Sequence, residues 1–210
     1  MRVCLVSDTH MQHDALAVEP CDLFLHAGDA TLHGQRDEWE AFCRWVGALP
    51  ARHKVITAGN HDFCVESVPE EAGEVARAQG VTLLLDEGVT VEGLRIWGSP
   101  ISPTFCHMAF NRDRGRAIRA HWARIPAGVD VLVTHGPPKG LGDRVSEGDE
   151  VGCEDLLDRV LGVRPRVHAF GHIHEARGEY ALPGVRTRFL NVASCTRWPM
   201  QPRAPVVLEL

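Results

Sequence analysis

The sequence contains no long apolar segment. No stretch approaches the roughly 20 consecutive apolar residues of a transmembrane helix. The apolar run at residues 3–6 is also far shorter than the hydrophobic region of a signal peptide. We therefore expect a soluble protein without a membrane segment, located in the cytoplasm.

Long runs of charge of one sign are also missing. The chain has 22 Lys and Arg residues against 28 Asp and Glu residues, which gives a net charge of −6. This balance argues against a general surface for a nucleic-acid polymer or an anionic membrane. An anionic ligand would have to be attracted by a local positive site, and we expect the partner to be a small molecule.

The seven cysteines include no Cys-x-x-Cys pair. This absence argues against a zinc knuckle or a redox motif. An odd number of scattered cysteines fits a reducing compartment, in which most of them act as small buried apolar residues. Histidine, in contrast, occurs 12 times, and neutral imidazole is the commonest metal ligand, so the composition favours a metal site.

The hydrophobic pattern predicts a single α/β domain over residues 1–210. No internal repeat, low-complexity segment or linker interrupts the chain, and 44% hydrophobic residues suffice for one large core. Helical periodicity predicts helices at 35–49, 70–80, 111–125 and 153–162. Short apolar runs predict strands at 2–6, 22–27, 54–58, 81–85, 89–97, 129–133, 167–170, 187–192 and 206–210, with a turn at 86–88.

Side chains of the kinds that bind metals follow five of the predicted strands. They are Asp8 and His10, Asp29, Asn60 and His61, His135, and His172 and His174. Ligands of open α/β folds gather beyond the carboxyl ends of the strands, so five such ends can meet at one place. We expect His172 and His174 to point to the same side, because residues two apart in an extended segment do so. A His-x-His pair alone is also compatible with an exposed loop.

The number of candidate ligands indicates two metal ions. Even without His61, seven side chains remain, which exceed the needs of one four-coordinate zinc ion: Asp8, His10, Asp29, Asn60, His135, His172 and His174. One carboxylate can bridge two ions, and mixed nitrogen and oxygen ligation without thiolate suits Mn, Fe, Zn, Co or Ni better than Ca or Mg. Two cations roughly 3.5 to 4 Å apart clamp a phosphoryl group and lower the pKa of a shared water, which makes hydroxide available for in-line attack. The pattern predicts metal-assisted hydrolysis of an anionic ester.

Five short motifs occur in a fixed order along the chain. They are Asp8-x-His10, Gly28-Asp29, Gly59-Asn60-His61-Asp62, Thr134-His135-Gly136 and Gly171-His172-Ile173-His174. This set resembles that of the calcineurin-like metallophosphoesterases. Further segments resemble the metallophosphoesterase-domain-containing subfamily best known from vertebrates, among them 25–29, 98–100, 109–111, 134–138, 151–153 and 170–175.

The resemblance implies both a fold and an activity. The fold is a four-layer αββα sandwich, in which helices flank two central mixed sheets. The activity is that of a binuclear phosphodiesterase, rather than a monoesterase, which acts on small or cyclic nucleotide esters. Mn or Fe are the favoured metals.

The resemblance also implies roles for individual residues. One ion would be held by Asp8, His10 and His174, the other by Asn60, His135 and His172, with Asp29 bridging. His61 is similar to the family's second-sphere histidine, which stabilises a phosphoryl oxygen or protonates the leaving alkoxide, and Asp62 would orient it. In vertebrate members, Gly replaces the residue that corresponds to His172. The presence of His172 predicts a complete binuclear metal site and stronger metal-dependent hydrolysis than in those members.

Contacts to the substrate are less determined by the sequence. The candidates are Asn60, His61, His107, Arg112 and Arg114, with His33 and Arg197 as loop residues of undecided role. Two alternatives to the phosphodiesterase remain, which are a catalytically weak scaffold that binds metal or nucleotide with a regulatory role, and a metal hydrolase of amide bonds. We expect a monomer or a small homo-oligomer.

Overall fold

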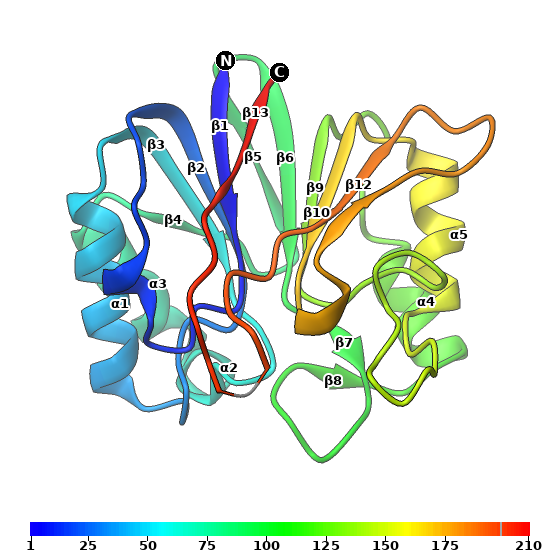
Figure 1. Cartoon of the computed structure of the whole chain (residues 1–210), viewed down its shortest axis with the longest axis horizontal. Helices are drawn as coiled ribbons and strands as arrows, with labels where there is room; N and C mark the ends of the chain where they lie inside the picture. Colours follow the sequence, from blue (N-terminus) through cyan, green and yellow to red (C-terminus); the bar gives the residue numbers. More distant parts are fainter. Residues whose placement is uncertain (198) are drawn as a thin grey trace.

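The computed structural model describes residues 1–197 and 199–210. Two mixed β-sheets lie at the centre, and helices cover the outer side of each (Figure 1). Helices α1 (Arg36–Ala48) and α3 (Pro69–Ala78) flank one sheet, while α4 (Arg116–Trp122) and α5 (Glu154–Val163) flank the other. This arrangement confirms the predicted four-layer sandwich.

The first sheet has the strand order β13-β1-β2-β3-β4. Its strands are β1 (Arg2–Val6), β2 (Cys21–Ala27), β3 (Ala51–Thr57), β4 (Thr82–Leu83) and β13 (Val206–Glu209). Strands β1 to β4 are parallel and β13 is antiparallel to β1. The residues that follow β1, β2 and β3 therefore emerge at the same edge of the sheet.

The second sheet has the order β11-β12-β10-β9-β6-β5. Its strands are β5 (Glu87–Val91), β6 (Leu94–Ser99), β9 (Val131–Thr134), β10 (Val167–Phe170), β11 (Gly178–Tyr180) and β12 (Arg188–Asn191). Strands β6, β9, β10 and β12 run parallel, so the segments after β9 and β10 also share an edge. Short elements complete the fold: β7 (Ser102–Pro103), β8 (Asn111–Arg112), α2 (Phe63–Ser67), and the 3-10 turns η1 (His13–Ala15) and η2 (His174–Ala176).

The side chains of each strand alternate between its two faces, and this alternation divides the core into separate layers. In β2, Leu23 and Leu25 belong to the apolar cluster that both sheets share, whereas Phe24 belongs to the cluster that includes Trp39 and Phe42 of α1. Successive side chains of a strand point to opposite faces, which produces this division. The buried cysteines are Cys4, Cys43, Cys153 and Cys195, as predicted for small apolar residues.

Three predicted elements differ from the observed ones. The single strand predicted at 89–97 is a hairpin, because Glu92 (φ 46°) and Gly93 (φ 88°) form a tight turn between β5 and β6. The predicted turn at 86–88 is correct only at Asp86, since the next two residues already belong to β5. The helix predicted at 111–125 is shorter, because residues 111–112 pair with β7 and Gly115 (φ 82°) precedes the first helical turn.

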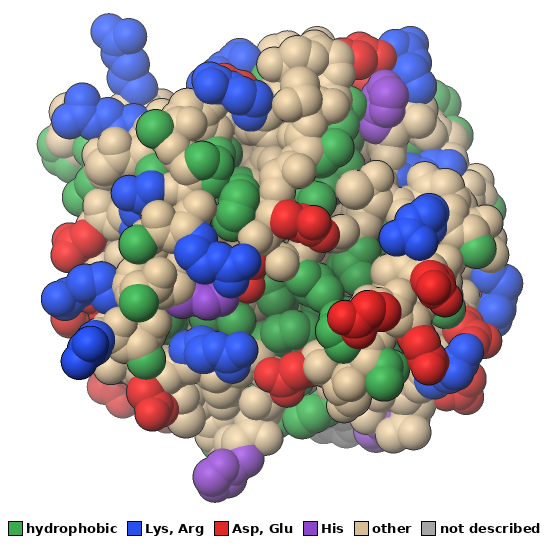
Figure 2. Space-filling model, turned by 180° about the vertical axis from the view of Figure 1, so that it is seen from behind, with side chains coloured by type: hydrophobic (Ala, Val, Ile, Leu, Met, Phe, Trp, Pro, Cys, Tyr) green, Lys and Arg blue, Asp and Glu red, His purple; other side chains and the backbone are tan. Residues whose placement is uncertain are grey.

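Charges of both signs are distributed over the molecular surface. Figure 2 shows Lys and Arg side chains beside Asp and Glu side chains, with hydrophobic side chains visible in a hollow between them. On this face, neither sign forms a continuous patch. Within the described part of the chain, the helices are too short or too polar to cross a bilayer.

Two fully buried histidines support the strand ends. The Nε2 atom of His26 lies 3.2 Å from Thr9 Oγ1, and that of His168 lies 2.9 Å from Thr134 Oγ1. Each threonine is adjacent to a predicted metal ligand in the sequence. Burial lowers the pKa of both histidines to about 3, so both are neutral in the folded protein. Both are therefore histidines of the core.

The buried neutral state of His168 makes stability depend on pH. In the unfolded chain its pKa is near 6.5, whereas in the fold it is about 3. Between these values the unfolded state binds a proton that the native state does not, so wild-type stability falls as the pH falls. His168→Gln removes this titration. We expect the cost of the substitution to shrink between pH 8 and pH 5, measured by urea unfolding, and a constant cost would contradict this expectation.

Candidate metal centre

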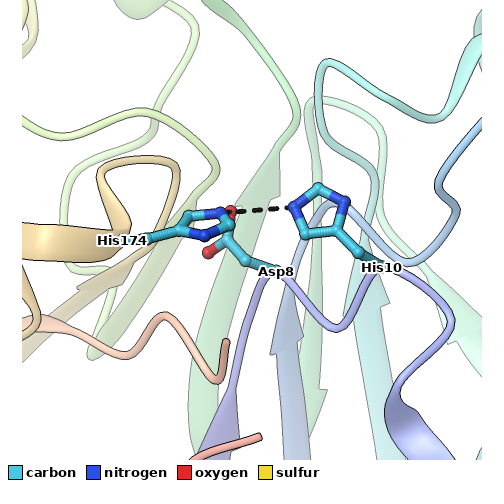
Figure 3. Close-up of side chains that lie close together, drawn as sticks. All are labelled: Asp8, His10 and His174. Carbon is cyan, nitrogen blue, oxygen red and sulfur yellow. Dashed lines mark hydrogen bonds and ion pairs between the residues drawn. The ribbon is translucent and has the colours of Figure 1, made fainter. Parts of the chain in front are cut away.

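The predicted ligands converge where the strand ends of both sheets meet. Three overlapping groups place their ligand atoms within 4.8 Å of one another: Asp8, His10 and His174; His10, Asp29 and His61; and Asp29, His135 and His172. Figure 3 shows the first group, in which the Nε2 atoms of His10 and His174 lie 3.2 Å apart and the Asp8 carboxylate lies beside the His174 ring. His10 and Asp29 each occur in two of the groups, so the three groups form one continuous cluster.

The ligands are presented by sharply turned backbone and not by extended segments. Asp8, His10, Asp29 and His172 all have φ between 39° and 69°. The expectation that His172 and His174 extend from adjacent positions of a strand is wrong, because His172 is left-handed and His174 begins η2. Left-handed non-glycine residues are strained, and such strain persists where the surrounding structure enforces it. Here the Asp8 carboxylate accepts the His172 N–H at 3.0 Å.

Close backbone approach at one glycine supports the same turn. A Cβ atom at Gly171 would overlap Asp8 Oδ2 and Ser7 Oγ. Residue 171 therefore has to lack a side chain if β10 is to deliver His172 and His174 next to the end of β1.

The orientation of two imidazoles fits a bound cation. His10 Nδ1 lies 3.2 Å from the Thr31 carbonyl and His135 Nδ1 lies 3.0 Å from the Ala27 carbonyl, so in each ring Nδ1 donates and Nε2 keeps its lone pair. His135 Nε2 then faces Asn60 Oδ1 at 2.8 Å. With the ring neutral, these two acceptors can share a metal ion, and without a metal a proton on His135 Nε2 satisfies them instead. A carbonyl on the opposite ring nitrogen is typical of metal-binding histidines.

The electrostatics of the cluster also favour positive charge. Burial alone would raise the pKa of Asp8 and Asp29, but the neighbouring histidines hold both well below the usual range. Burial would lower the pKa of His135, yet the Asp29 carboxylate raises it to about 9. Two ionised carboxylates are thus fixed in a buried site, which is the environment that binds cations.

Asp62 holds the backbone and does not orient His61. Its carboxylate accepts the N–H groups of Gly59 at 2.8 Å, Asp29 at 3.0 Å and Thr31 at 2.9 Å. The predicted contact with the His61 ring is wrong, since His61 Nδ1 bonds instead to the Leu32 carbonyl at 2.9 Å. Burial, together with the nearby Asp29 charge, raises the pKa of Asp62 to about 6. Asp62 joins the loops that follow β2 and β3.

Removal of the Asp62 carboxylate is expected to loosen these loops. Asp62→Ala leaves buried N–H groups unpaired, each at a cost of about 1–3 kcal/mol, so the free energy of unfolding should fall by several kcal/mol. Urea denaturation of the metal-free protein measures this loss. His61→Ala is the control, because its side chain is only half-buried, and equal losses in the two variants would contradict the bracing role.

A cavity of about 710 Å³ adjoins the ligand cluster. Its lining includes Asn60, His61 and Arg114 among the predicted substrate contacts, and also Arg197. His107 and Arg112 do not line it. Arg112 is exposed and bonds to the carbonyl of the preceding Asn111, and His107 is exposed on the loop between β7 and β8. His33, also exposed, lies outside it.

Several lining residues have no signal in the sequence. These are Thr104, Phe105, Cys106, Met108, Val145 and Met200. They lie on loops whose path depends on tertiary contacts, so neither periodicity nor a motif marks them. The cavity consequently has polar residues at the cluster and a largely apolar wall.

Comparison with known proteins decides the family. Residues 1–176 match the family model for calcineurin-like phosphoesterases. The chain belongs to the calcineurin-like phosphoesterase family. It is 37% identical to the human Metallophosphoesterase domain-containing protein 1, over all of this chain and 71% of that protein. It is 34% identical to UPF0046 protein K07C11.7 of Caenorhabditis elegans, over all of this chain and 75% of that protein.

Solved structures show that this phosphoesterase shares its fold with distant proteins. Phosphopantetheinyl Hydrolase (PptH) from Mycobacterium tuberculosis has a TM-score of 0.62 at 16% identity, with 91% of this chain and 88% of that chain covered. The protein TT1561 of Thermus thermophilus has a TM-score of 0.63 at 14% identity, with the same coverage. Family and cluster together make the chain a metal-binding hydrolase of phosphoesters.

Proposed function

We propose that this phosphoesterase is a binuclear phosphodiesterase for small, nucleotide-type or cyclic phosphoesters. The observation that carries the proposal is the position of Asp29. Its Oδ2 lies 3.7 Å from His10 Nε2 and its Oδ1 lies 3.4 Å from His135 Nε2. One carboxylate thus faces two separate sets of ligands, as a bridge between two ions does.

The geometry supports the assignment of the ligands to two ions. Asp8, His10 and His174 would hold one ion and Asn60, His135 and His172 the other, with Asp29 shared. Nitrogen and oxygen donors without a thiolate suit transition metals, and we favour Mn or Fe. Bound ions would supply Lewis acidity and lower the pKa of a water.

His61 is the protein group best placed to act on the leaving oxygen. Its ring centroid is 4.7 Å from that of His10, and it lines the cavity. Because Nδ1 is directed to the Leu32 carbonyl, Nε2 is left for the substrate. In the protonated ring, Nε2–H can donate to a phosphoryl oxygen or to the leaving alkoxide.

The size of the cavity favours a diester over a monoester. A volume of about 710 Å³ lies in the range of sites for drug-sized ligands. A second ester group therefore has room beside the phosphoryl group. The net charge of −6 and the mixed surface charge support a small-molecule substrate over a nucleic-acid polymer. A cytoplasmic location is part of the same proposal.

Hydrolysis of bis-p-nitrophenyl phosphate by the metal-reconstituted protein tests the mechanism. We expect the wild type to bind two ions and to turn over the substrate. Asp29→Ala should lose the binuclear site and the turnover. His61→Ala should retain the ions and lose about 10²–10⁴-fold in kcat, the usual contribution of a positioned acid. Equal turnover by the wild type and Asp29→Ala would refute the two-metal mechanism. Two bound ions without turnover on a broad panel of phosphoesters would indicate a scaffold instead.

The substitution His172→Gly separates metal binding from stability. The left-handed backbone at His172 (φ 69°) suits glycine, so loss of the side chain relieves strain without a clash. We expect lower occupancy of one ion and lower turnover, together with an unchanged or higher Tm of the metal-free protein. Metal analysis and calorimetry measure these effects, and full occupancy of both ions would contradict the assignment of His172.

A further inference from the structure

Arg114 places a positive charge at the wall of the cavity without a carboxylate partner. It lies between β8 and α4 and lines the cavity. Its Nη1 donates to the Gly152 carbonyl at 2.8 Å and its Nη2 to the Val151 carbonyl at 2.5 Å. In residues 1–197 and 199–210, it takes part in no ion pair. Arg197, in contrast, lies 3.6 Å from both Glu147 and Glu175.

The position of Arg114 is tied to the metal cluster through the backbone. Cys153 N donates to the Pro137 carbonyl at 3.0 Å and Lys139 N donates to the Cys153 carbonyl at 3.1 Å. The segment that holds the guanidinium therefore pairs with the segment that directly follows His135. The guanidinium is thus anchored to the same frame as the cluster.

The guanidinium keeps donors free for a ligand. It has five N–H groups, and the two carbonyl bonds use two of them. Carbonyl oxygens orient the group but do not neutralise its charge. In a chain with net charge −6, an unneutralised cation at a cavity attracts an anion locally.

The cavity that contains both Arg114 and the cluster has a largely apolar wall. Phe105 has its ring centroid 5.0 Å from that of His172, and its N–H is held by Asn111 Oδ1 at 3.0 Å. Met108, Val145, Ile173 and Met200 also line the cavity. A ligand that reaches both the cluster and Arg114 therefore passes an apolar surface.

We propose that Arg114 binds a second anionic group of the substrate, distinct from the phosphoryl group at the metal cluster. The substrate is then a phosphodiester in which one ester group has an apolar or aromatic body and carries an anion. This inference rests on the proposed phosphodiesterase function and adds a determinant of specificity to it. Arg114 acts on affinity for the ester group, whereas the chemistry takes place at the cluster.

Two chromogenic diesters test the proposal. They are 4-nitrophenyl phenyl phosphate and 4-nitrophenyl 4-carboxyphenyl phosphate, which differ only in the carboxylate. We expect the wild type to prefer the carboxylated diester by about fivefold in kcat/KM, the scale of an accessible charge pair. In Arg114→Gln the ratio should fall to about one or below, and in Arg114→Lys part of the preference should remain. Arg112→Gln is the matched control, since Arg112 lies two residues away but outside the cavity, and its ratio should equal that of the wild type.

Each contrary result has a defined meaning. An equal fall for both diesters in Arg114→Gln would show that Arg114 contacts the reacting phosphoryl group, which overturns the proposal. A wild-type ratio of one would overturn it and leave the phosphodiesterase function intact. If neither diester is cleaved, the proposed function fails. Calorimetric binding of the same two diesters then tests the role of Arg114. Tighter binding of the carboxylated diester by the wild type, but not by Arg114→Gln, supports the proposal. Equal binding of the two diesters by the wild type refutes it.

Discussion

The buried carboxylate of Asp29 is the charge on which the rest of the site depends. A buried carboxylate is costly unless hydrogen bonds, ion pairs or a cation compensate it. Here the His61 N–H donates to Oδ1 at 2.8 Å, while His10 and His135 approach the two oxygens from different sides. Burial would raise the pKa of Asp29, but these histidines keep it ionised. The fold has to supply partners for one charge from both sheets.

The packing of the two sheets determines whether these partners lie within reach of the Asp29 carboxylate. The shared apolar cluster contains Leu25 of the first sheet and Val133 of the second, each a few residues before its ligand. Beyond this cluster, a Cβ at Gly28 would lie 2.5 Å from the Ala58 carbonyl oxygen and 2.7 Å from His135 Nδ1. Close packing transmits even small displacements, so the spacing of the ligands is a consequence of the core.

The sequence predicts which candidate ligands come together, because each of them follows the end of an apolar strand. An apolar strand followed by Asp29 or by His135 is a local pattern, and parallel strands bring such ends together. The geometry of the turns is different, because left-handed φ at His172 is enforced by the Asp8 carboxylate, 164 residues away in sequence. The predicted role of Asp62 is wrong for the same reason, since its partners Asp29 and Thr31 lie in another loop. Local patterns therefore identify the chemistry, and long-range contacts determine its orientation.

In the proposed phosphodiesterase, the chemistry and the specificity for the substrate would lie in different parts of the molecule. The ligands follow strands that the core holds rigidly, and proteins at 14–16% identity share this framework. The wall that a substrate's second ester group would meet comes from loops, which contribute Phe105, Val151 and Met200. Loops tolerate substitution because little of the core depends on them. A charged group at such a wall without an ion-pair partner, as at Arg114 among the described residues, is therefore better evidence of substrate class than the fold itself.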